Sequence, residues 1–175
     1  MNIAVFGCHK PSTQSMPILT LAISLLIIML YPLSVAANEY DQAKRIHQRL
    51  AGVAPEASVL STMASHIKNN NGNLATAIAM DNDGFYNVTL KNFVTPWTNE
   101  SQTVFADLND YTATVIGLIR DGGDFREILY ADMVYTAQGL ATLPAYSSSN
   151  NDHYEALENG HHSLKTHLQR AKQSA

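Results

Sequence analysis

The stretch LNDYTATVIGLIRDGGDFREILYADMVY, Leu108–Tyr135, is the most regularly patterned part of the chain, and it predicts two short helices joined at a double glycine. Asn109 is a favourable N-cap, and apolar residues follow it at helical spacing as far as Leu118. Gly122 and Gly123 interrupt this pattern, because glycine commonly ends a helix. We therefore expect a helix–turn–helix corner whose residues are explained by capping and burial.

The second helix of this corner is predicted from two features that follow the glycines. Asp124 and Glu127 have the spacing of a capping box. Phe125, Ile128 and Leu129 then form an apolar stripe at helical spacing. Both features favour a helix that continues toward the end of the quoted stretch.

Four more short helices are expected before the corner, over residues 38–52, 55–72, 73–80 and 84–93. The last of them is less regular, because Tyr86, Val88 and Leu90 alternate as they would in a strand. The predicted fold class is therefore mainly α, an irregular bundle of short helices that follows an N-terminal signal peptide.

The N-terminus carries the features of an export signal. Ile18–Tyr31 is an uncharged run of 14 residues, preceded by Lys10 and followed by small residues that suit signal peptidase. Its length fits a signal-peptide core better than a membrane span of about 20 residues. We expect residues 1–37, which include the only cysteine, Cys8, to be a signal peptide and the remainder to be periplasmic or secreted. The alternative is an uncleaved leader, which would be the only part to contact a membrane.

The remainder of the chain is predicted to comprise a helical domain, 38–139, and a tail, 140–175. The tail begins with a polar linker and is expected to end in a basic amphipathic helix. The first 37 residues contribute one base and no acid, so residues 38–175 carry 10 bases against 15 acids, a net charge of −5. This charge argues against a nucleic-acid partner, because such a partner requires a basic surface.

Two motifs suggest metal binding only incompletely. Asp81, Asp83 and Gly84 match the middle of an EF-hand loop, but its first and last ligand positions hold alanine and leucine. A turn that joins two helices explains these residues better. His162 and His167 are five residues apart rather than the four that align two histidines on one helix face. No metal site and no catalytic residue is therefore assigned.

Four residues are candidates for ligand binding: Trp97, Tyr111, Arg120 and Asp132. Trp97 follows Pro96 in a loop and serves either as a stacking platform for a ligand ring or as an anchor for that loop. Asp132 is the acid least explained by caps and turns. It forms either a structural hydrogen bond or, together with Asp110, a carboxylate pair for hydrolysis.

The phrase Phe125–Asp132, FREILYAD, resembles a recurring phrase in exported, uncharacterised bacterial proteins that carry a downstream cytochrome c-like module, and more distantly in secreted cytochrome-associated proteins of planctomycetes. The resemblance covers about Tyr40–Tyr135. It implies a non-catalytic domain associated with a periplasmic redox or haem protein, whose partner is another protein or a missing C-terminal domain. C-x-x-C-H is absent, so haem is expected only through such a downstream module, and the chain would be a truncated portion. The alternatives are an extracytoplasmic small-ligand or protein-binding module and, more remotely, a carboxylate-dependent hydrolase.

Overall fold

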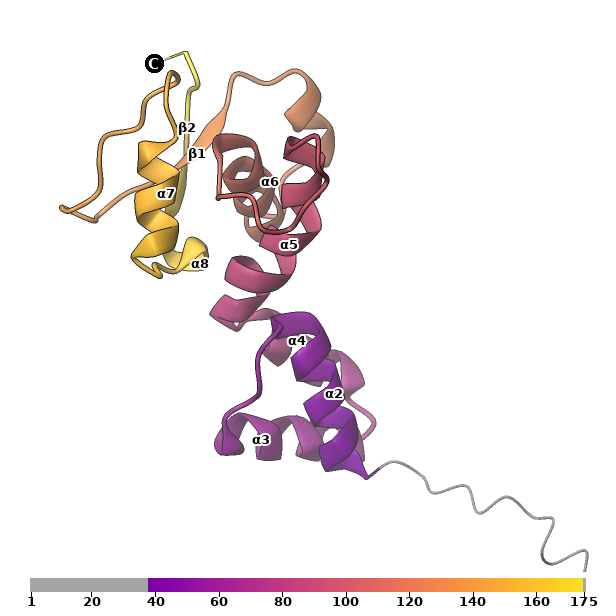
Figure 1. Cartoon of the computed structure of the whole chain (residues 1–175). Coiled ribbons are helices and arrows are strands. Elements are labelled where there is room, and N and C mark those ends of the chain that lie inside the picture. Colours follow the sequence, from indigo (N-terminus) through magenta and orange to yellow (C-terminus); the bar gives the residue numbers. More distant parts are fainter. Residues whose placement is uncertain (1–37, 175) are drawn as a thin grey trace, which may run out of the picture. The chain divides into compact units, whose positions relative to one another are not determined.

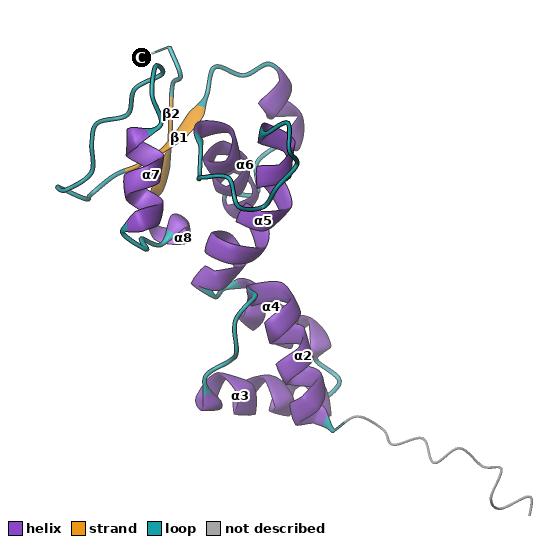
Figure 2. Cartoon of the chain, in the orientation of Figure 1, coloured by secondary structure: helices purple, strands orange, loops and turns teal. Residues whose placement is uncertain are grey.

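The computed structural model describes residues 38–174, which belong to one compact unit (Figure 1). This part of the chain is mainly helical and contains one two-stranded sheet (Figure 2), so the predicted fold class is confirmed. The predicted signal peptide, residues 1–37, lies outside the described residues. Among residues 38–174, no helix has the length and the apolar character that a membrane crossing requires.

Most of the helices are short. The α-helices are α2 (Glu39–Ala51), α3 (Ala57–Lys68), α4 (Gly72–Met80), α5 (Lys91–Val94), α6 (Asp110–Arg120), α7 (Asp152–Asn159) and α8 (Leu164–His167). A π-helix, η1 (Phe85–Leu90), precedes α5, and two 3-10 helices are η2 (Thr95–Thr98) and η3 (Phe125–Leu129). The strands are β1 (Val134–Ala137) and β2 (Leu168–Ala171).

Helices α2, α3 and α4 pack on one another, as their apolar spacing predicts. The side chain of Asn38 caps α2 by accepting a hydrogen bond from the backbone N–H of Tyr40 at 3.0 Å. Gly52 ends the helix in the left-handed conformation, with φ at 71°, which confirms the predicted stop. Small side chains dominate the buried cluster between the three helices, which allows their backbones to approach closely: Ala43, Met63, Ala64, Ala75 and Ala79.

Helix α6 begins and ends where the sequence predicts. The Asn109 side chain accepts a hydrogen bond from the backbone N–H of Thr112 at 2.9 Å. At the other end, Gly122 has φ at +63°, and its N–H donates to the carbonyl of Ile119. The N–H of Gly123 donates to the carbonyl of Leu118, so the double glycine completes a Schellman motif. The double glycine therefore serves to end a buried helix.

The segment after the double glycine differs from the prediction. The predicted second helix is only the short 3-10 helix η3, followed by strand β1. Phe125 and Leu129, expected on a buried stripe, are 50% and 86% exposed. The Asp124 side chain does cap the backbone of Arg126, but Glu127 pairs with Arg170 instead of completing a capping box. A stripe without a partner cannot stabilise a helix, because packing supplies most helical stability in proteins.

Strand β1 is fixed against α6 through one tyrosine. Tyr135 is 1% exposed, and its ring lies so close to Gly117 that any side chain at that position would overlap it. The Tyr135 backbone N–H donates to Thr114 Oγ1 at 3.1 Å, and its hydroxyl donates to Asp121 Oδ2 at 2.8 Å. Burial, together with the Asp121 carboxylate, raises the pKa of the Tyr135 phenol to about 12.

The prediction of a basic amphipathic helix at the C-terminal end of the tail is wrong. Only α8, a single turn, is helical, and β2 follows it in an antiparallel pair with β1. Arg120 Nη1 donates to the carbonyls of Lys165 and Leu168, at 2.9 and 2.5 Å. A continuing helix would need the Lys165 carbonyl for its own ladder. Strand β1 precedes the predicted boundary at 139/140 and β2 follows it. Because the two strands pair and share one hydrophobic core, this boundary does not separate two packed parts.

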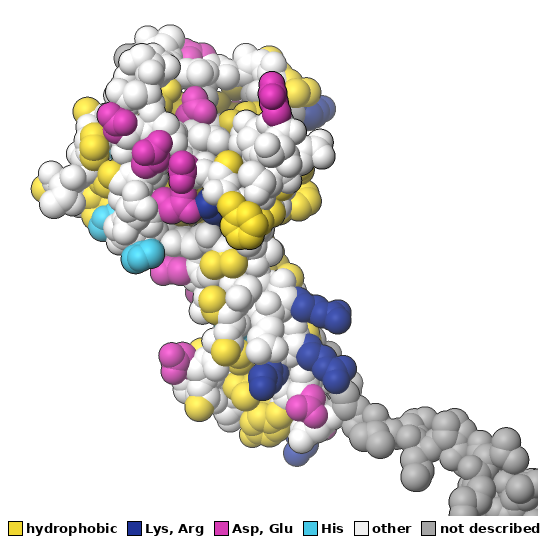
Figure 3. All heavy atoms as spheres, in the orientation of Figure 1, with side chains coloured by type: hydrophobic (Ala, Val, Ile, Leu, Met, Phe, Trp, Pro, Cys, Tyr) yellow, Lys and Arg dark blue, Asp and Glu magenta, His cyan; other side chains and the backbone are white. Residues whose placement is uncertain are grey.

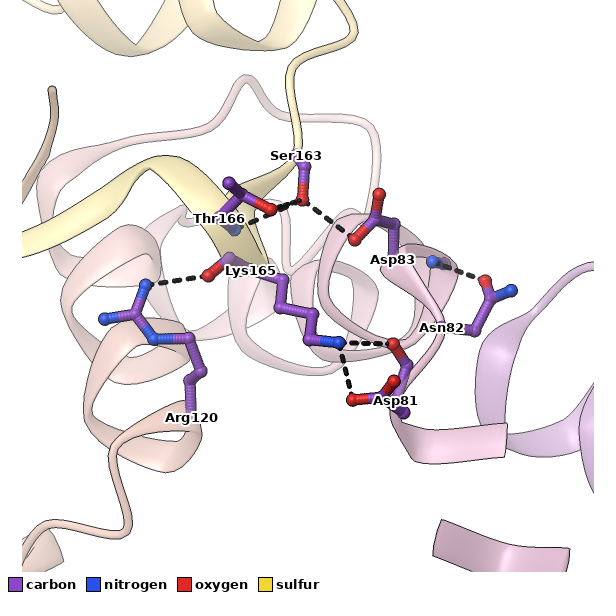
Figure 4. A network of polar contacts seen from close by, with 8 residues as sticks. Asp81, Asn82, Asp83, Arg120, Ser163, Lys165 and Thr166 are labelled. Carbon is purple, nitrogen blue, oxygen red and sulfur yellow. Dashed lines mark hydrogen bonds and ion pairs between the residues drawn. The ribbon is translucent and has the colours of Figure 1, made fainter. Parts of the chain in front are cut away.

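A polar network ties α8 to the turn that follows α4 (Figure 4). Lys165 Nζ contacts the Asp81 backbone carbonyl at 2.7 Å and its carboxylate at 2.5 Å. Ser163 Oγ donates to Asp83 Oδ1 at 2.8 Å, while Asn82 closes the turn by accepting from the N–H of Gly84. The acidic residues that resemble half of an EF-hand loop therefore hold the C-terminal segment in place.

Candidate functional site

Two of the four predicted ligand-binding residues line one open groove at the start of α6. The groove has a volume of about 470 Å³ and is lined by Trp97, Thr98, Asn109, Asp110 and Tyr111. Trp97 is 52% exposed and Tyr111 is 40% exposed, so both rings are accessible. We call this set of five residues the aromatic groove.

The loop that carries Trp97 is held by side-chain hydrogen bonds. Asn99 Nδ2 donates to the carbonyls of Thr95 and Thr103, at 2.8 and 3.0 Å, and its Oδ1 accepts from the Thr103 N–H. Asn109 Nδ2 donates to Thr98 Oγ1 at 2.9 Å and so joins η2 to the start of α6. These hydrogen bonds, rather than the two rings themselves, therefore position Trp97 relative to Tyr111.

The aromatic groove contains one negative charge. Asp110 Oδ1 accepts the Tyr111 backbone N–H at 2.7 Å, and among residues 38–174 no donor contacts its second oxygen. Trp97 packs edge-on against Phe93, with ring centroids 4.9 Å apart, and both of these rings are more than half exposed. The groove thus offers two accessible aromatic rings and a carboxylate oxygen that is able to accept a hydrogen bond.

Arg120, the third predicted residue, does not line this groove. Its guanidinium donates to two backbone carbonyls of the C-terminal segment, contacts Asp121 at 2.7 Å and lies 5.9 Å from the centre of the Tyr135 ring. The hydrogen bonds from Arg120 and Tyr135 lower the pKa of the Asp121 carboxyl, although partial burial opposes them. These contacts give Arg120 a structural role, because they join the end of α6 to the C-terminal segment.

Asp132, the fourth predicted residue, is exposed at the surface. Its carboxylate accepts hydrogen bonds from the N–H and the hydroxyl of Ser174, at 3.0 and 2.5 Å. These bonds lower the pKa of Asp132. Asp132 does not line the aromatic groove, so the structure does not bring its carboxylate together with that of Asp110 in this groove.

A second cavity, of about 390 Å³, was not predicted. It lies between the π-helix η1 and the end of α7, and we call it the α7 pocket. Lys91 and Glu158 form an ion pair in its wall, with their side chains 12% and 34% exposed. Glu158 Oε2 also accepts the Leu108 backbone N–H at 2.7 Å. One sequence signal was available, because Lys91 is the only basic residue between Lys68 and Arg120.

The backbone around the α7 pocket is unusual at two places. Asn87 and Val88 belong to the π-helix, a rare conformation that is often found at functional sites. Asn87 Nδ2 donates to the His162 carbonyl at 2.9 Å, and its Oδ1 accepts from the Leu164 N–H at 3.0 Å. His161, between α7 and α8, has φ at +51°, a conformation that non-glycine residues adopt infrequently.

The histidines of this region do not form a metal centre in the described part of the chain. His162 and His167 pack edge-on, with ring centroids 5.9 Å apart. Across residues 38–174, no group of three histidine, cysteine or acidic side chains has the proximity that a metal ion needs. Comparison with known proteins adds no assignment, since no family model, curated protein or solved structure matches the chain.

Proposed function

We propose that this protein is an extracytoplasmic binding protein and that the aromatic groove holds one ring of a saccharide. The observation that carries this proposal is the pairing of two accessible rings, Trp97 and Tyr111, with the available oxygen of Asp110. One face of a sugar ring is rich in C–H groups and packs on an aromatic ring, while its hydroxyls donate to a carboxylate. Because the groove is open, it suits a ring that forms part of a longer chain.

The proposed location outside the cytoplasm depends on the N-terminal sequence. The uncharged run Ile18–Tyr31 and the small residues after it support cleavage near Asn38. Fractionation of the native host, followed by N-terminal sequencing of the purified protein, tests this part directly. A cytosolic protein that retains Met1–Ala37 would contradict it.

The single tryptophan makes the groove directly observable. Because Trp97 is the only tryptophan in the chain, intrinsic tryptophan fluorescence reports on the groove alone. We expect a saturable change during titration with oligomers of glucose or N-acetylglucosamine. Tyr111→Ala should weaken binding about tenfold, equivalent to about 1.4 kcal/mol.

A matched control separates the groove from the general surface. Tyr130 is 75% exposed and does not line the groove, so Tyr130→Ala should bind with unchanged affinity. The proposal fails if no soluble oligosaccharide changes the fluorescence in a saturable way. It also fails if the two tyrosine variants weaken binding equally.

A second candidate function is association with a haem protein. It is favoured by the exposed apolar residues of one short segment: Phe125, Leu129 and Tyr130 are 50%, 86% and 75% exposed. Clustered exposed apolar residues are typical of protein interaction sites. If a periplasmic c-type cytochrome is the partner, the two proteins should co-elute in gel filtration, and Leu129→Asp should abolish co-elution. Separate elution at micromolar concentrations would exclude a stable complex with the cytochrome tested.

A further inference from the structure

We propose that the α7 pocket is a second binding site, specific for a small organic amine whose ammonium group binds Asp107. This site is distinct from the aromatic groove, because the two cavities share no lining residue. The inference rests on three properties of the pocket: the state of its charged groups, the nature of its uncharged lining and the charge of the surrounding chain.

The charged groups of the pocket leave one carboxylate without a counter-ion. Lys91 and Glu158 neutralise each other, and the second oxygen of Glu158 accepts the Leu108 N–H. Asp107 is exposed, and within the described chain it has neither an ion pair nor a hydrogen bond. A ligand anion would therefore find the lysine already paired, whereas a ligand cation would find a carboxylate available.

The uncharged lining suits an ammonium group on a short hydrocarbon chain. Val88, Leu108 and Leu164 provide an apolar surface, and the rings of His161 and His162 offer nitrogen atoms. A neutral imidazole has one nitrogen that accepts a hydrogen bond, so such a ring is able to accept a hydrogen bond from an ammonium N–H. A few polar groups set in an apolar lining are typical of small-molecule sites.

The charge of the surrounding chain favours the same ligand. Residues 81–175 contain six bases and 12 acids, a net charge of −6, whereas residues 38–80 carry four bases and three acids. Figure 3 shows acidic side chains gathered on one face of the molecule. A surface of one sign attracts small ions of the opposite sign. Attraction of this kind is not specific, so the experiment must distinguish it from binding at Asp107.

Isothermal titration calorimetry with 1,4-diaminobutane tests the proposal on the purified protein. We expect one saturable site for the diamine and none for succinate, an anion of similar length. Asp107→Asn should weaken diamine binding about tenfold or more, because a charge-assisted hydrogen bond is lost. Since Asp107 is exposed and forms no hydrogen bond with the rest of the described chain, this variant should melt at the wild-type temperature.

The matched control is Asp152→Asn, which removes an exposed acid on α7 that does not line the pocket. It should change the affinity by less than about twofold. Equal weakening by both variants would show general attraction to an acidic surface and would overturn the proposal, as would the absence of saturable binding. Tyr111→Ala should leave diamine binding unchanged, so failure at the α7 pocket is distinguishable from failure at the aromatic groove.

Discussion

Replacement of Gly117 by alanine tests how β1 is fixed to the buried helix α6. A Cβ at this position would overlap the Tyr135 ring, and even the third-nearest ring atom, Cε1, would lie only 2.6 Å away. Carbon atoms in van der Waals contact are about 3.5–4.0 Å apart, so the ring must move. Tyr135 cannot move freely, because its hydroxyl donates to Asp121 and its backbone is paired within the ladder.

The expected magnitude follows from three opposing contributions. Alanine in place of glycine inside a helix raises the free energy of unfolding by about 1 kcal/mol. Overpacking costs about 1–3 kcal/mol. Loss of the hydrogen bond from Tyr135 to the Asp121 carboxylate costs about a further 1.5 kcal/mol, the low end of the range, because that carboxylate is 42% exposed. Gly117→Ala should therefore lower the free energy of unfolding by about 1.5–3.5 kcal/mol.

Urea denaturation followed by far-ultraviolet circular dichroism measures this difference. The control is Gly72→Ala at the start of α4, where an added Cβ meets no atom within 4 Å, and it should not lower stability. In a Tyr135→Val background the ring is absent, so Gly117→Ala should become neutral or stabilising. A Gly117→Ala protein as stable as the wild type would refute the packing of Tyr135 on α6.

Two further predictions concern side chains that link separate parts of the described chain. Because hydrogen bonds from Arg120 and Tyr135 lower the pKa of Asp121 below its ordinary value of 3.8, its ionised form stabilises the fold above pH 3.8. This contribution is lost as the pH falls through the lowered pKa. Urea titrations should therefore find Asp121→Asn less stable than the wild type at pH 6 and equally stable near pH 2. A difference in stability that stays constant between these pH values would contradict this prediction. His153 is 4% exposed, accepts the Ala137 N–H and contacts the carbonyl of Pro144 at 2.7 Å. His153→Leu should lower the free energy of unfolding by about 2–4 kcal/mol and should accelerate proteolysis within residues 138–150. An unchanged urea denaturation midpoint would show that these contacts are dispensable.

Local signals in the sequence were sufficient for the first three helices and for α6. Helix caps form hydrogen bonds with backbone groups only a few residues away, so they can be predicted without knowledge of the tertiary structure. This applies to Asn109, Gly52 and the double glycine. The segments that were predicted wrongly depend on distant partners. Leu164 and Leu168 have helical spacing, but both are buried against residues that lie far away in the chain, and Arg120 takes the carbonyl that a helix would use.

The candidate site was predictable in part for the same reason. Trp97 and Tyr111 stand out as aromatic residues near a proline loop and a helix start, and the structure brings them to one groove. Trp97 is half exposed and packs edge-on against Phe93, so the ring is accessible to a ligand and also contacts the preceding helix α5. The pairing of Lys91 with Glu158 joins residues 67 positions apart, a contact that sequence spacing does not reveal.

The ladder between β1 and β2 imposes an order on the assembly of the molecule. Helices α2, α3 and α4 make their contacts within about 40 consecutive residues, so they can form as soon as that segment exists. Strand β1 must instead wait for residues 168–171 before it gains its only strand partner among the described residues. Until residues 168–171 have left the ribosome, the packing around α6 remains incomplete. That delay suits the export proposed above, because a chain whose closing step of folding is still pending crosses a membrane in an unfolded form more readily.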